Sequence, residues 1–378
     1  MAASLNVKPA VAQAHYYFTE VGHRRSVAAY YYRELSAGRD IPPLTPEQKA
    51  AVHKVWHGRE GLYDPRWFDL FAAFNPSIGS DVCYFIPFDY WMVYIEPHIV
   101  SDARHDAIDD KNLYDLLFHD MRQPATILHK MRNGLFTDSA YGIIDRQQAV
   151  EYCRAAGHVV AKNSYRSGGG KGIHFWKAEE DSVESLEWLL DLEGERVVQV
   201  VVRQHPAMAA LCSTSCNTVR LLTYIDGNGV AAVSSLVRFG KEGSLVDNVS
   251  SGGLLAAIAE DGTVQDYGLT GNGDKVFLHR PHESSYVVPG YGKCWEQAKR
   301  VAPRLASVSR VIQWDFAIDE AGEPVLIEVN LGWTGMQYYQ VLSGPVMKDH
   351  LLSLLAEVPI RRIPRHRVAD LLLRLFDR

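Results

Sequence analysis

The first part of the chain shows the residue spacing of amphipathic helices. Up to about residue 75, apolar positions recur at intervals of three and four residues, as in HRRSVAAYYYREL (23–35) and TPEQKAAVHKVWHG (45–58). Thr45, Pro46 and Glu47 supply a cap and a first turn for the second of these segments. The N-terminal region is therefore predicted to be rich in helices.

Between residues 81 and 157 the chain alternates between strand and helix patterns. DVCYFIPFDYWMVYIEP (81–97) is aromatic and β-branched, which predicts an interrupted strand. KNLYDLLFHDMR (111–122) is typical of a helix, and ATILHKMRNG (125–134) is typical of a strand. DRQQAVEYCRAAG (145–157) predicts a short amphipathic helix that ends at its glycine.

From 158 to 330 the pattern is one of short strands joined by turns. HVVAKN and GIHFWK flank a glycine-rich loop, and SVESLEWLLDL predicts a helix before the strand RVVQVVV. Asp226–Gly229 and Asp261–Gly262 are hairpin turns between apolar runs, and VIQWDFAI and PVLIEVN form the last pair of strands. This density of hairpins predicts a mostly antiparallel sheet with a few helices packed on it, which is an α+β fold.

Composition and charge narrow the class of protein. Of the 378 residues, 47% are hydrophobic and 22% are charged, as in a globular protein of two or three subdomains. The formal charge of −6 argues against nucleic acid as the main partner. Without a signal-peptide layout or a long apolar stretch, we expect a cytoplasmic protein with no membrane insertion. The scattered cysteines predict no disulfide framework, and Cys212 and Cys216 lack the second ligand pair of a structural zinc site.

Three oxygen-bearing side chains converge in the hairpin of residues 308–330. Glu328 and Asn330 are two residues apart on a predicted strand, so both project from one face. A turn centred on Ala321–Gly322 places Asp315 directly opposite Glu328. Mg²⁺ would remove the cost of two like charges in an apolar hairpin, because hard cations prefer oxygen ligands. A half-exposed hairpin whose acids face water fits the same residues, so the pattern alone leaves both interpretations open.

A glycine-rich run follows the strand that ends near Lys162. Glycines let backbone N–H groups approach phosphate oxygens closely, and a nearby lysine supplies compensating charge. Because Lys171 is followed by Gly172 and then by a strand, the run is not a Walker A loop. A hairpin that folds over a triphosphate and an ordinary loop both fit this pattern.

Further polar candidates lie on the strands that follow. Gln199 interrupts the apolar strand RVVQVVV, which could offer backbone groups to an adenine edge or be a plain core strand. Arg220 and Arg238 lie on the two strands of the next hairpin, and their guanidinium groups suit either phosphate or a surface ion pair. Asn217 and the pair Asp247–Asn248 are additional candidates.

The order of these elements resembles that of the ATP-grasp superfamily. A lysine strand, a glycine-rich lid, an apolar strand and an N-T-x-R strand precede an Asp that is followed after twelve residues by Glu-x-Asn. The strings NTVRLLT, VDNVSSGG and WDFAIDEAGEPVLIEVN are most similar to the branch known as sugar-transfer-associated ATP-grasp. IPFDYWMVYIEP and DDKNLYDLLFHDMRQPATILHKMRNG also resemble the N-terminal portion of that branch, and the resemblance covers roughly residues 110–340.

The resemblance implies two β-rich lobes, a small lid and a larger C-terminal lobe, that clasp ATP. Lys162 would contact the phosphates with Lys130 as its partner lysine, and the glycines would cover the triphosphate. Gln199 would hold adenine together with the backbone of Val200 and Val202. The implied nucleotide-binding residues are Lys130, Lys162, Gly168, Gly169, Gly170, Gln199, Val200, Val202 and Asn248.

The same resemblance implies a magnesium site and a catalytic set. Asp315, Glu328 and Asn330 would hold two Mg²⁺, for which Mn²⁺ could substitute. Arg220 and Arg238 would face phosphate and would act in catalysis together with Lys162.

The expected activity is that of an ATP-dependent ligase. A substrate carboxylate would become an acylphosphate, and an amine, thiol or hydroxyl would then displace phosphate, in cell-surface glycan or specialised metabolite biosynthesis. Gln313 departs from the pattern, because peptide-forming relatives such as D-alanine–D-alanine ligase carry an arginine two residues before the metal aspartate. The acceptor is therefore open, and a kinase acting on a hydroxyl or a nucleotide-binding scaffold without turnover are the alternatives.

Four regions are expected. Residues 1–109 form a helix-rich N-terminal region, and 110–205 form the N-terminal part of the ATP-grasp unit with the lid. Residues 206–345 form the C-terminal lobe with the metal site, and 346–378 form a basic helical tail. The expected partners are a small-molecule carboxylate and a nucleophilic acceptor, and a homodimer remains possible.

Overall fold

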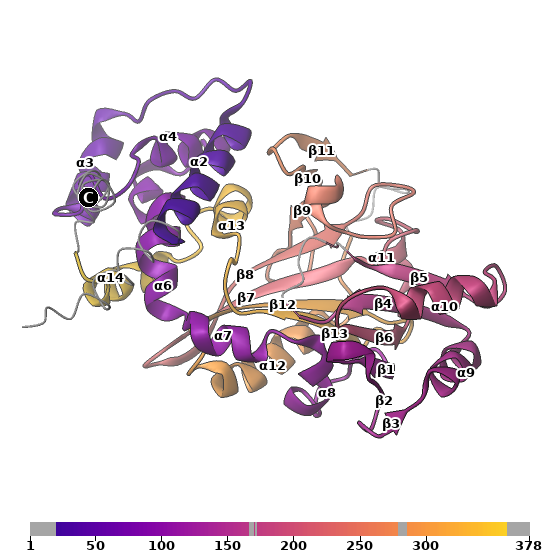
Figure 1. The fold of residues 1–378 in the computed structure, drawn as a ribbon. Coiled ribbons are helices and arrows are strands. Elements are labelled where there is room, and N and C mark those ends of the chain that lie inside the picture. The colour runs from indigo at the N-terminus through magenta and orange to yellow at the C-terminus, as the bar shows by residue number, and fades with distance from the viewer. Residues whose placement is uncertain (1–19, 166–169, 171, 279–285, 361–378) are drawn as a thin grey trace, which may run out of the picture. The chain divides into compact units, whose positions relative to one another are not determined.

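A computed structural model describes residues 20–165, 170, 172–278 and 286–360 of the chain (Figure 1). The described residues divide into two compact units. One unit, here called the helical unit, draws on Met1–His98 and Gly335–Arg378, and the other, the sheet unit, is Ile99–Thr334. The division lies near the expected boundary at 109, but it assigns the segment after Thr334 to the helical unit. The predicted tail helix within 361–378 lies outside the described residues.

Every regular element among the described residues of the helical unit is a helix, as the N-terminal pattern predicts. The capping box of α3, in which Thr45 and Gln48 exchange side-chain and backbone hydrogen bonds, confirms the predicted start of that helix. The elements are α2 (Gly22–Ser36), α3 (Pro46–Trp56), α4 (Arg66–Phe74), η2 (Gly79–Tyr84), α5 (Phe88–Tyr90), η3 (Trp91–Ile95), α6 (Glu96–Ile99), α13 (Met336–Ser343) and α14 (Lys348–Glu357).

The predicted strand over 81–97 is wrong, because this segment folds as a chain of short helical turns from η2 to α6. Consecutive residues from Phe85 to Phe88 and from Tyr90 to Glu96 are buried, whereas a half-exposed strand would bury every second residue. Tyr90, for example, meets Trp56 edge-to-face at 5.2 Å and stacks on Tyr94 at 4.9 Å between ring centroids. The aromatic content that favours a strand in isolation is therefore satisfied by packing among helices, which outweighs β-propensity.

The sheet unit contains two antiparallel sheets, which confirms the predicted α+β class. The first has six strands in the order β3-β2-β1-β6-β4-β5. Helices α9 (Arg146–Ala156) and α10 (Val183–Asp191) contribute to the core on one of its faces. Its strands are β1 (Thr126–Lys130), β2 (Phe136–Asp138), β3 (Ile143–Ile144), β4 (His158–Asn163), β5 (His174–Lys177) and β6 (Arg196–Val200).

The second sheet has seven strands in the order β11-β10-β9-β8-β7-β12-β13. Asp226 faces Gly229 at the tight turn between β7 and β8, as the sequence predicts. The strands are β7 (Thr218–Asp226), β8 (Gly229–Phe239), β9 (Leu254–Ala257), β10 (Tyr267–Leu269), β11 (Lys275–Phe277), β12 (Val311–Ile318) and β13 (Pro324–Asn330). The other helical elements of the unit are α7 (Asp102–Ile108), η4 (Lys111–Leu113), α8 (Tyr114–Leu117), η5 (Arg132–Gly134), α11 (Pro206–Ala209), η6 (Val249–Ser251), α12 (Tyr291–Val301) and η7 (Ala302–Leu305).

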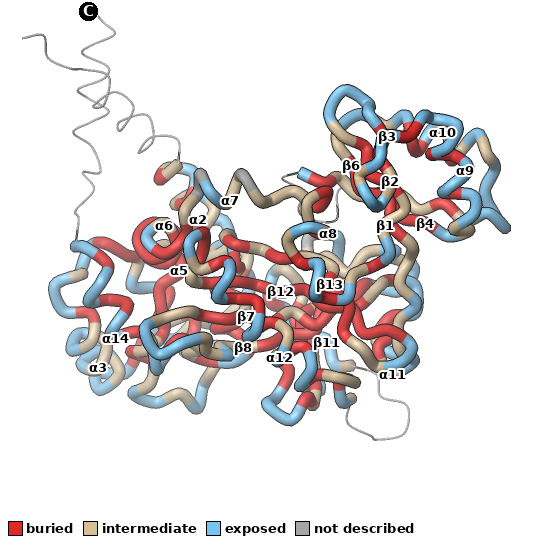
Figure 2. The backbone as a smooth tube through the Cα atoms, turned by 90° about the horizontal axis from the view of Figure 1, so that it is seen from below, coloured by how far each residue is buried: buried red, intermediate tan, exposed pale blue. Residues whose placement is uncertain are grey.

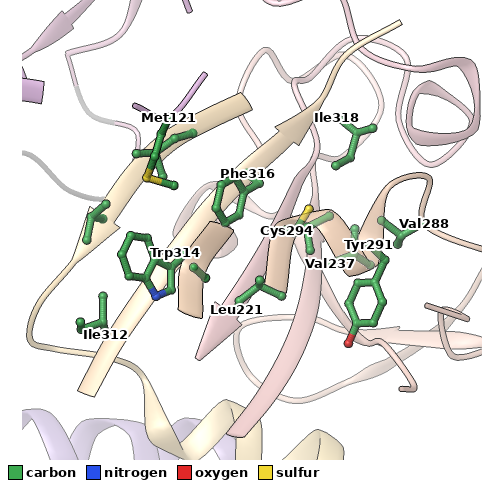
Figure 3. Close-up of a cluster of buried hydrophobic side chains, with 14 of the residues drawn as sticks. Met121, Leu221, Val237, Val288, Tyr291, Cys294, Ile312, Trp314, Phe316 and Ile318 are labelled. Carbon is green, nitrogen blue, oxygen red and sulfur yellow. The ribbon is translucent and has the colours of Figure 1, made fainter. Parts of the chain in front are cut away.

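One face of the seven-stranded sheet carries the main apolar core. Trp314 and Phe316 of β12 lie there with Leu221 of β7 and Val237 of β8, and α12 adds Cys294 (Figure 3). Strand β12 is buried along its whole length, most of β7 is buried, and β8 is buried over its second half (Figure 2). Because side chains alternate along a strand, the residues between these core positions project from the opposite face. That opposite face carries the candidate site.

Candidate functional site

The carboxylate hairpin consists of β12 and β13. Asp315 faces Glu328 directly, which confirms the predicted pairing, and Gln313 faces Asn330. The carboxylate of Asp319 closes the turn by accepting a hydrogen bond from the N–H of Ala321 at 3.0 Å. All four side chains of the two facing pairs therefore share the face that lies opposite the apolar core.

A β-bulge makes this pairing possible. The register shifts after Asp315, because Phe316 faces Leu326 and leaves Ile327 as the extra residue on β13. For the residue pairs nearest the turn the midpoint is Ala321, whereas the predicted midpoint lies between Ala321 and Gly322. Without the bulge, Asp315 would face Ile327, and both acidic side chains could not lie on one face.

Asp315 is held by two arginines from the neighbouring strands. Arg220 of β7 donates from Nε at 2.7 Å and from Nη2 at 2.6 Å, and Arg238 of β8 donates from Nη1 at 3.1 Å. Burial would raise the pKa of Asp315, but Arg220 and then Arg238 hold it below its usual range. The structure therefore brings together the predicted metal aspartate and both predicted phosphate arginines.

Asp247 anchors the outer end of this network. Its carboxylate accepts a hydrogen bond from Nη2 of Arg238 at 2.8 Å and another from the hydroxyl of Thr218. Burial raises the pKa of Asp247, and Arg238 opposes that rise. The amide oxygen of Asn248 lies 3.4 Å from the same guanidinium. Arg238 is thus fixed between Asp315 and the 247–248 segment, which the sequence had marked as polar candidates.

Lys111 pairs with the second carboxylate, and sequence reasoning did not single it out. Its side-chain ammonium lies 2.7 Å from Oε1 of Glu328, and its backbone N–H donates to the backbone carbonyl of Ser164 at 2.9 Å. Burial would lower the pKa of Lys111, but Glu328 raises it above its ordinary value. The string DDKNLYDLLFHD, which resembles the ATP-grasp branch, contains this lysine and could have drawn attention to it.

Lys162 of β4 faces this cluster from the six-stranded sheet. Its ammonium donates to the side-chain oxygen of Gln199 at 3.2 Å. Burial lowers its pKa, with nearby Cys216 opposing and Lys111 adding to the decrease. The N–H of Val200, one of the predicted adenine contacts, donates to the carbonyl of Ala125 at 2.9 Å. Val202, the other, lies two residues beyond the end of β6.

Lys130 does not join Lys162, contrary to the predicted partnership. Lys130 faces Arg196 on β6 whereas Lys162 faces Val197, so the two lysines project from opposite faces of the sheet. The ammonium of Lys130 donates to the carbonyls of Leu190 at 2.8 Å and Leu192 at 2.6 Å, at the C-terminal end of α10. This lysine therefore caps a helix, next to a surface pocket of about 720 Å³.

Part of the predicted glycine lid can be placed. Gly168 and Gly169 lie outside the described residues. Gly170 has a φ of +67°, and a side chain there would approach Asn248 to 3.4 Å and Val246 to 3.5 Å. Gly170 therefore lies beside the segment that holds Arg238, and a glycine suits its backbone conformation.

The cluster fits a magnesium–polyphosphate group in the chemistry of its donors. Its metal candidates offer only carboxylate and amide oxygens, which Mg²⁺ prefers, and its cations outnumber its carboxylates. Nδ2 of Asn330 lies 3.5 Å from Asp315, so the amide is close to the carboxylate pair. The charged members of the cluster are Lys111, Lys162, Arg220, Arg238, Asp247, Asp315 and Glu328.

Comparison with protein families identifies the family of the chain. The family described as sugar-transfer associated ATP-grasp matches residues 96–354, well over half of the chain. The chain belongs to this family. The predicted family and fold are thereby confirmed, and so is the expectation of an enzyme of the ATP-grasp type. No curated protein matches the chain at a significant level.

Solved structures give distant likenesses. An ADP complex of N5-carboxyaminoimidazole ribonucleotide synthetase has 12% identity and a TM-score of 0.37, covering 59% of this chain and 45% of that one. For D-alanyl-alanine synthetase A from Vibrio cholerae the values are 12% and 0.38, with 66% of each chain covered. Biotin carboxylase from Campylobacter jejuni gives 12% and 0.42, with 72% and 50% covered. This ATP-grasp chain thus spans about half the length of the first and third, and likenesses at this level identify no reaction.

Two other sequence predictions can be compared with the structure. All five cysteines are free thiols in the structure. In the part of the chain that the structure describes, helices are too short or too polar for a membrane span.

Proposed function

We propose that this ATP-grasp protein is a ligase that activates a small-molecule carboxylate through an acylphosphate. The observation that carries the proposal is the pairing of cations and carboxylates on one sheet face, with Arg220 on Asp315 and Lys111 on Glu328. A catalyst of phosphoryl transfer needs fixed positive groups around the transferring phosphate and oxygen ligands for its metal. Both kinds of group are present here and lie within hydrogen-bond distance of each other.

The carboxylates orient the cations as well as neutralise them. Arg220 is bound through two nitrogens, which fixes the plane of its guanidinium, and Arg238 is clamped between Asp247 and Asp315. Groups that are already oriented lose little freedom when phosphate arrives, so their charge acts without reorganisation. We assign Arg220, Arg238, Lys111 and Lys162 to phosphate binding.

Asp315, Glu328 and Asn330 would hold Mg²⁺, in one or two ions and with Mn²⁺ as a substitute. When bound, the metal would neutralise phosphate charge and polarise the transferring phosphoryl group. Gln199 and the backbone near Val200 and Val202 would hold adenine, and Gly168 to Gly170 would cover the phosphates. Lys130 is left out of this assignment, because it lies on the other face of its sheet.

The proposed reaction has two steps. An oxygen of the substrate carboxylate attacks the γ-phosphorus of ATP, the bond to the β–γ bridging oxygen breaks, and ADP leaves with that electron pair. An amine, thiol or hydroxyl then attacks the acyl carbon, the carbon–oxygen bond to phosphate breaks, and the nucleophile loses its proton. No side-chain nucleophile is needed, so the residues contribute charge and position.

The acceptor half of the site differs from that of peptide-forming ligases. At the position where those enzymes carry an arginine, Gln313 is buried and donates from its amide to the carbonyl of Thr334 at 3.1 Å. A neutral amide cannot supply the charge of a guanidinium to an acylphosphate. We therefore propose an acceptor chemistry other than dipeptide formation, in cell-surface glycan or specialised metabolite biosynthesis, and the sugar-transfer association in the family description supports the first of these.

The test is phosphate release from ATP across panels of carboxylates, each with and without amines, thiols and alcohols. We expect release that depends on one class of carboxylate, and hydroxylamine should trap the acylphosphate as a hydroxamate. Phosphate release that never depends on a carboxylate would contradict the proposal. Product analysis separates the alternatives, because a kinase leaves a stable phosphoester and a scaffold binds ATP without turnover.

A further inference from the structure

Two histidines and a glutamate converge at the end of helix α3, in the helical unit. His53 and His57 are four residues apart, so their side chains lie on the same side of the helix end. Glu60 returns toward them from the turn after the helix. All three side chains are exposed, and α3 carries an exposed side in Figure 2. One ligand atom from each lies within 4.8 Å of those of the others.

The distances match the spacing of ligands around a tetrahedral cation. Nδ1 of His53 lies 3.4 Å from Oε1 of Glu60, and Nδ1 of His57 lies 3.6 Å from the same oxygen. Bonds of about 2.0–2.1 Å to zinc separate tetrahedral ligands by roughly 3.3 Å. The two imidazole rings are edge-to-face, with centroids 5.2 Å apart. Small side-chain rotations would therefore bring all three donors onto one ion.

We propose that His53, His57 and Glu60 form a binding site for a divalent transition-metal ion of the Zn²⁺ class. Imidazole nitrogens favour Zn²⁺, Ni²⁺ and Cu²⁺ over Mg²⁺, which prefers an all-oxygen set. Three protein ligands leave at least one position for water or for a further ligand. The site is thus different in chemistry and in place from the oxygen-only magnesium site of the sheet unit.

An ordinary surface ion pair explains the geometry less well. Both histidines direct the same ring atom at a single carboxylate oxygen, at distances beyond the usual range of a nitrogen–oxygen hydrogen bond. Exposed ion pairs contribute little energy, so they give no reason for two rings to converge on one atom. Backbone N–H groups of Glu60 and Gly58 lower the pKa of the Glu60 carboxyl, which favours its charged form.

Metal binding here would link α3 to the loop that follows it. The last residue of α3, Trp56, is fully buried and donates from its indole nitrogen to the carbonyl of Cys83 at 2.9 Å. Its ring also meets those of Tyr63 and Phe68 edge-to-face. A metal bridge from His53 to Glu60 would hold the turn beside this aromatic core, and binding to the folded state alone would stabilise it.

The test is a Zn²⁺ titration of the full chain after chelator treatment, with Mg²⁺ in excess and no nucleotide. We expect the wild type to bind one more equivalent of Zn²⁺ than His53→Ala or His57→Ala. Glu60→Gln should weaken that binding by roughly tenfold or more, since even outer-sphere changes cost a metal site that much. The matched control is His119→Ala, which removes an exposed histidine of the sheet unit and should leave the titration unchanged.

A second measurement localises the ion. Zn²⁺ should slow amide hydrogen exchange in residues 57–62 of the wild type but not of His53→Ala. The same stoichiometry and affinity in the wild type and in all three ligand variants would overturn the proposal. Because the readouts are metal binding and exchange without ATP, the result is independent of the proposed ligase activity.

Discussion

The two faces of the seven-stranded sheet are built from the same strands but differ in composition, because one is apolar and the other is charged. On one face, Trp314 and Phe316 of β12 lie in a continuous apolar core (Figure 3). On the other, Asp315 between them is bound by two arginines, and the facing Glu328 is bound by Lys111. Neighbouring residues in the sequence therefore belong to different environments, one without charge and one crowded with it.

The comparison indicates that the apolar face provides stability and that the charged face serves binding and chemistry. Burial of aromatic side chains is a direct source of folding free energy. Buried ion pairs contribute little net stability, because desolvation offsets their attraction, and they become costly when one partner is lost. A sheet face that holds this many charges is therefore better explained by what it binds than by what it adds to the fold.

The largest expected effect comes from the apolar face. Phe316→Ala removes a fully buried ring from the core and should lower the free energy of unfolding by about 3–5 kcal/mol, measured by chemical denaturation. Phe316→Leu is the control and should lower it by less than about 1.5 kcal/mol. Molecules that remain folded should turn over ATP at the wild-type rate. A loss of turnover without a loss of stability would show that the two faces are not separate in function.

On the polar face we expect the opposite result, a large loss of activity with a smaller loss of stability. Glu328→Gln keeps the size of the side chain but removes the charge that pairs with Lys111, and we expect kcat to fall by roughly 10²–10³-fold. The free energy of unfolding should fall by roughly 1–3 kcal/mol, less than in Phe316→Ala, because Lys111 is buried but the amide oxygen of glutamine can still accept its hydrogen bond. Measurements of kcat and of the free energy of unfolding on the same variant test this expectation. Normal turnover in this variant would refute the assignment of Glu328 to the metal.

Much of this contrast was predictable from the sequence. Alternation along VIQWDFAI and PVLIEVN predicts that Asp315, Glu328 and Asn330 share one face, and the turn predicts which residues oppose each other. The pairing is right although the turn is displaced, because the bulge at Ile327 restores the register. Strand periodicity is a local property, so it can be read from the sequence, whereas a bulge depends on how the two strands pack.

The predictions that fail concern properties that are not local to one segment of the chain. The residues of segment 81–97 favour a strand, but packing among helices decides its form. The family resemblance implies Lys130, from the preceding strand, as the partner of Lys162, but the strand register places the two lysines on opposite faces of the sheet. No local pattern marks Lys111, because it begins the short element η4 and its partner Glu328 lies 217 residues further along the chain. Each of these outcomes depends on contacts between residues far apart in the sequence.

A matched pair of lysine variants tests whether Lys111, rather than Lys130, contributes to ATP binding. Lys111→Gln should raise the KM for ATP by roughly tenfold, equivalent to about 1.4 kcal/mol, because it removes a phosphate-facing charge beside Glu328. Lys130→Gln should leave that KM within about twofold and lower the stability of the six-stranded sheet by roughly 1 kcal/mol, because it removes the cap on α10. Steady-state kinetics and hydrogen exchange measure the two effects. Equal KM values in both variants would remove Lys111 from the site.

The smallest effect is a shift in a pH profile. Burial lowers the pKa of Lys162, so the ammonium loses its proton at a pH below the ordinary lysine value. Below that pKa the lysine is charged and can bind phosphate, and above it the charge is lost, so kcat/KM for ATP should fall on the alkaline side. The profile of kcat should fall at a higher pH, since bound phosphate favours the charged form.

Replacement of this lysine separates its titration from any other alkaline effect. Lys162→Arg retains a positive charge to a higher pH and should move the alkaline limb of kcat/KM upward, even where the absolute rate falls. Phe316→Leu, which alters only the apolar face, should keep the wild-type profile. If both variants shift the limb alike, the limb reports unfolding of the sheet rather than the charge of Lys162. If neither shifts it, another group on the polar face controls the binding of ATP.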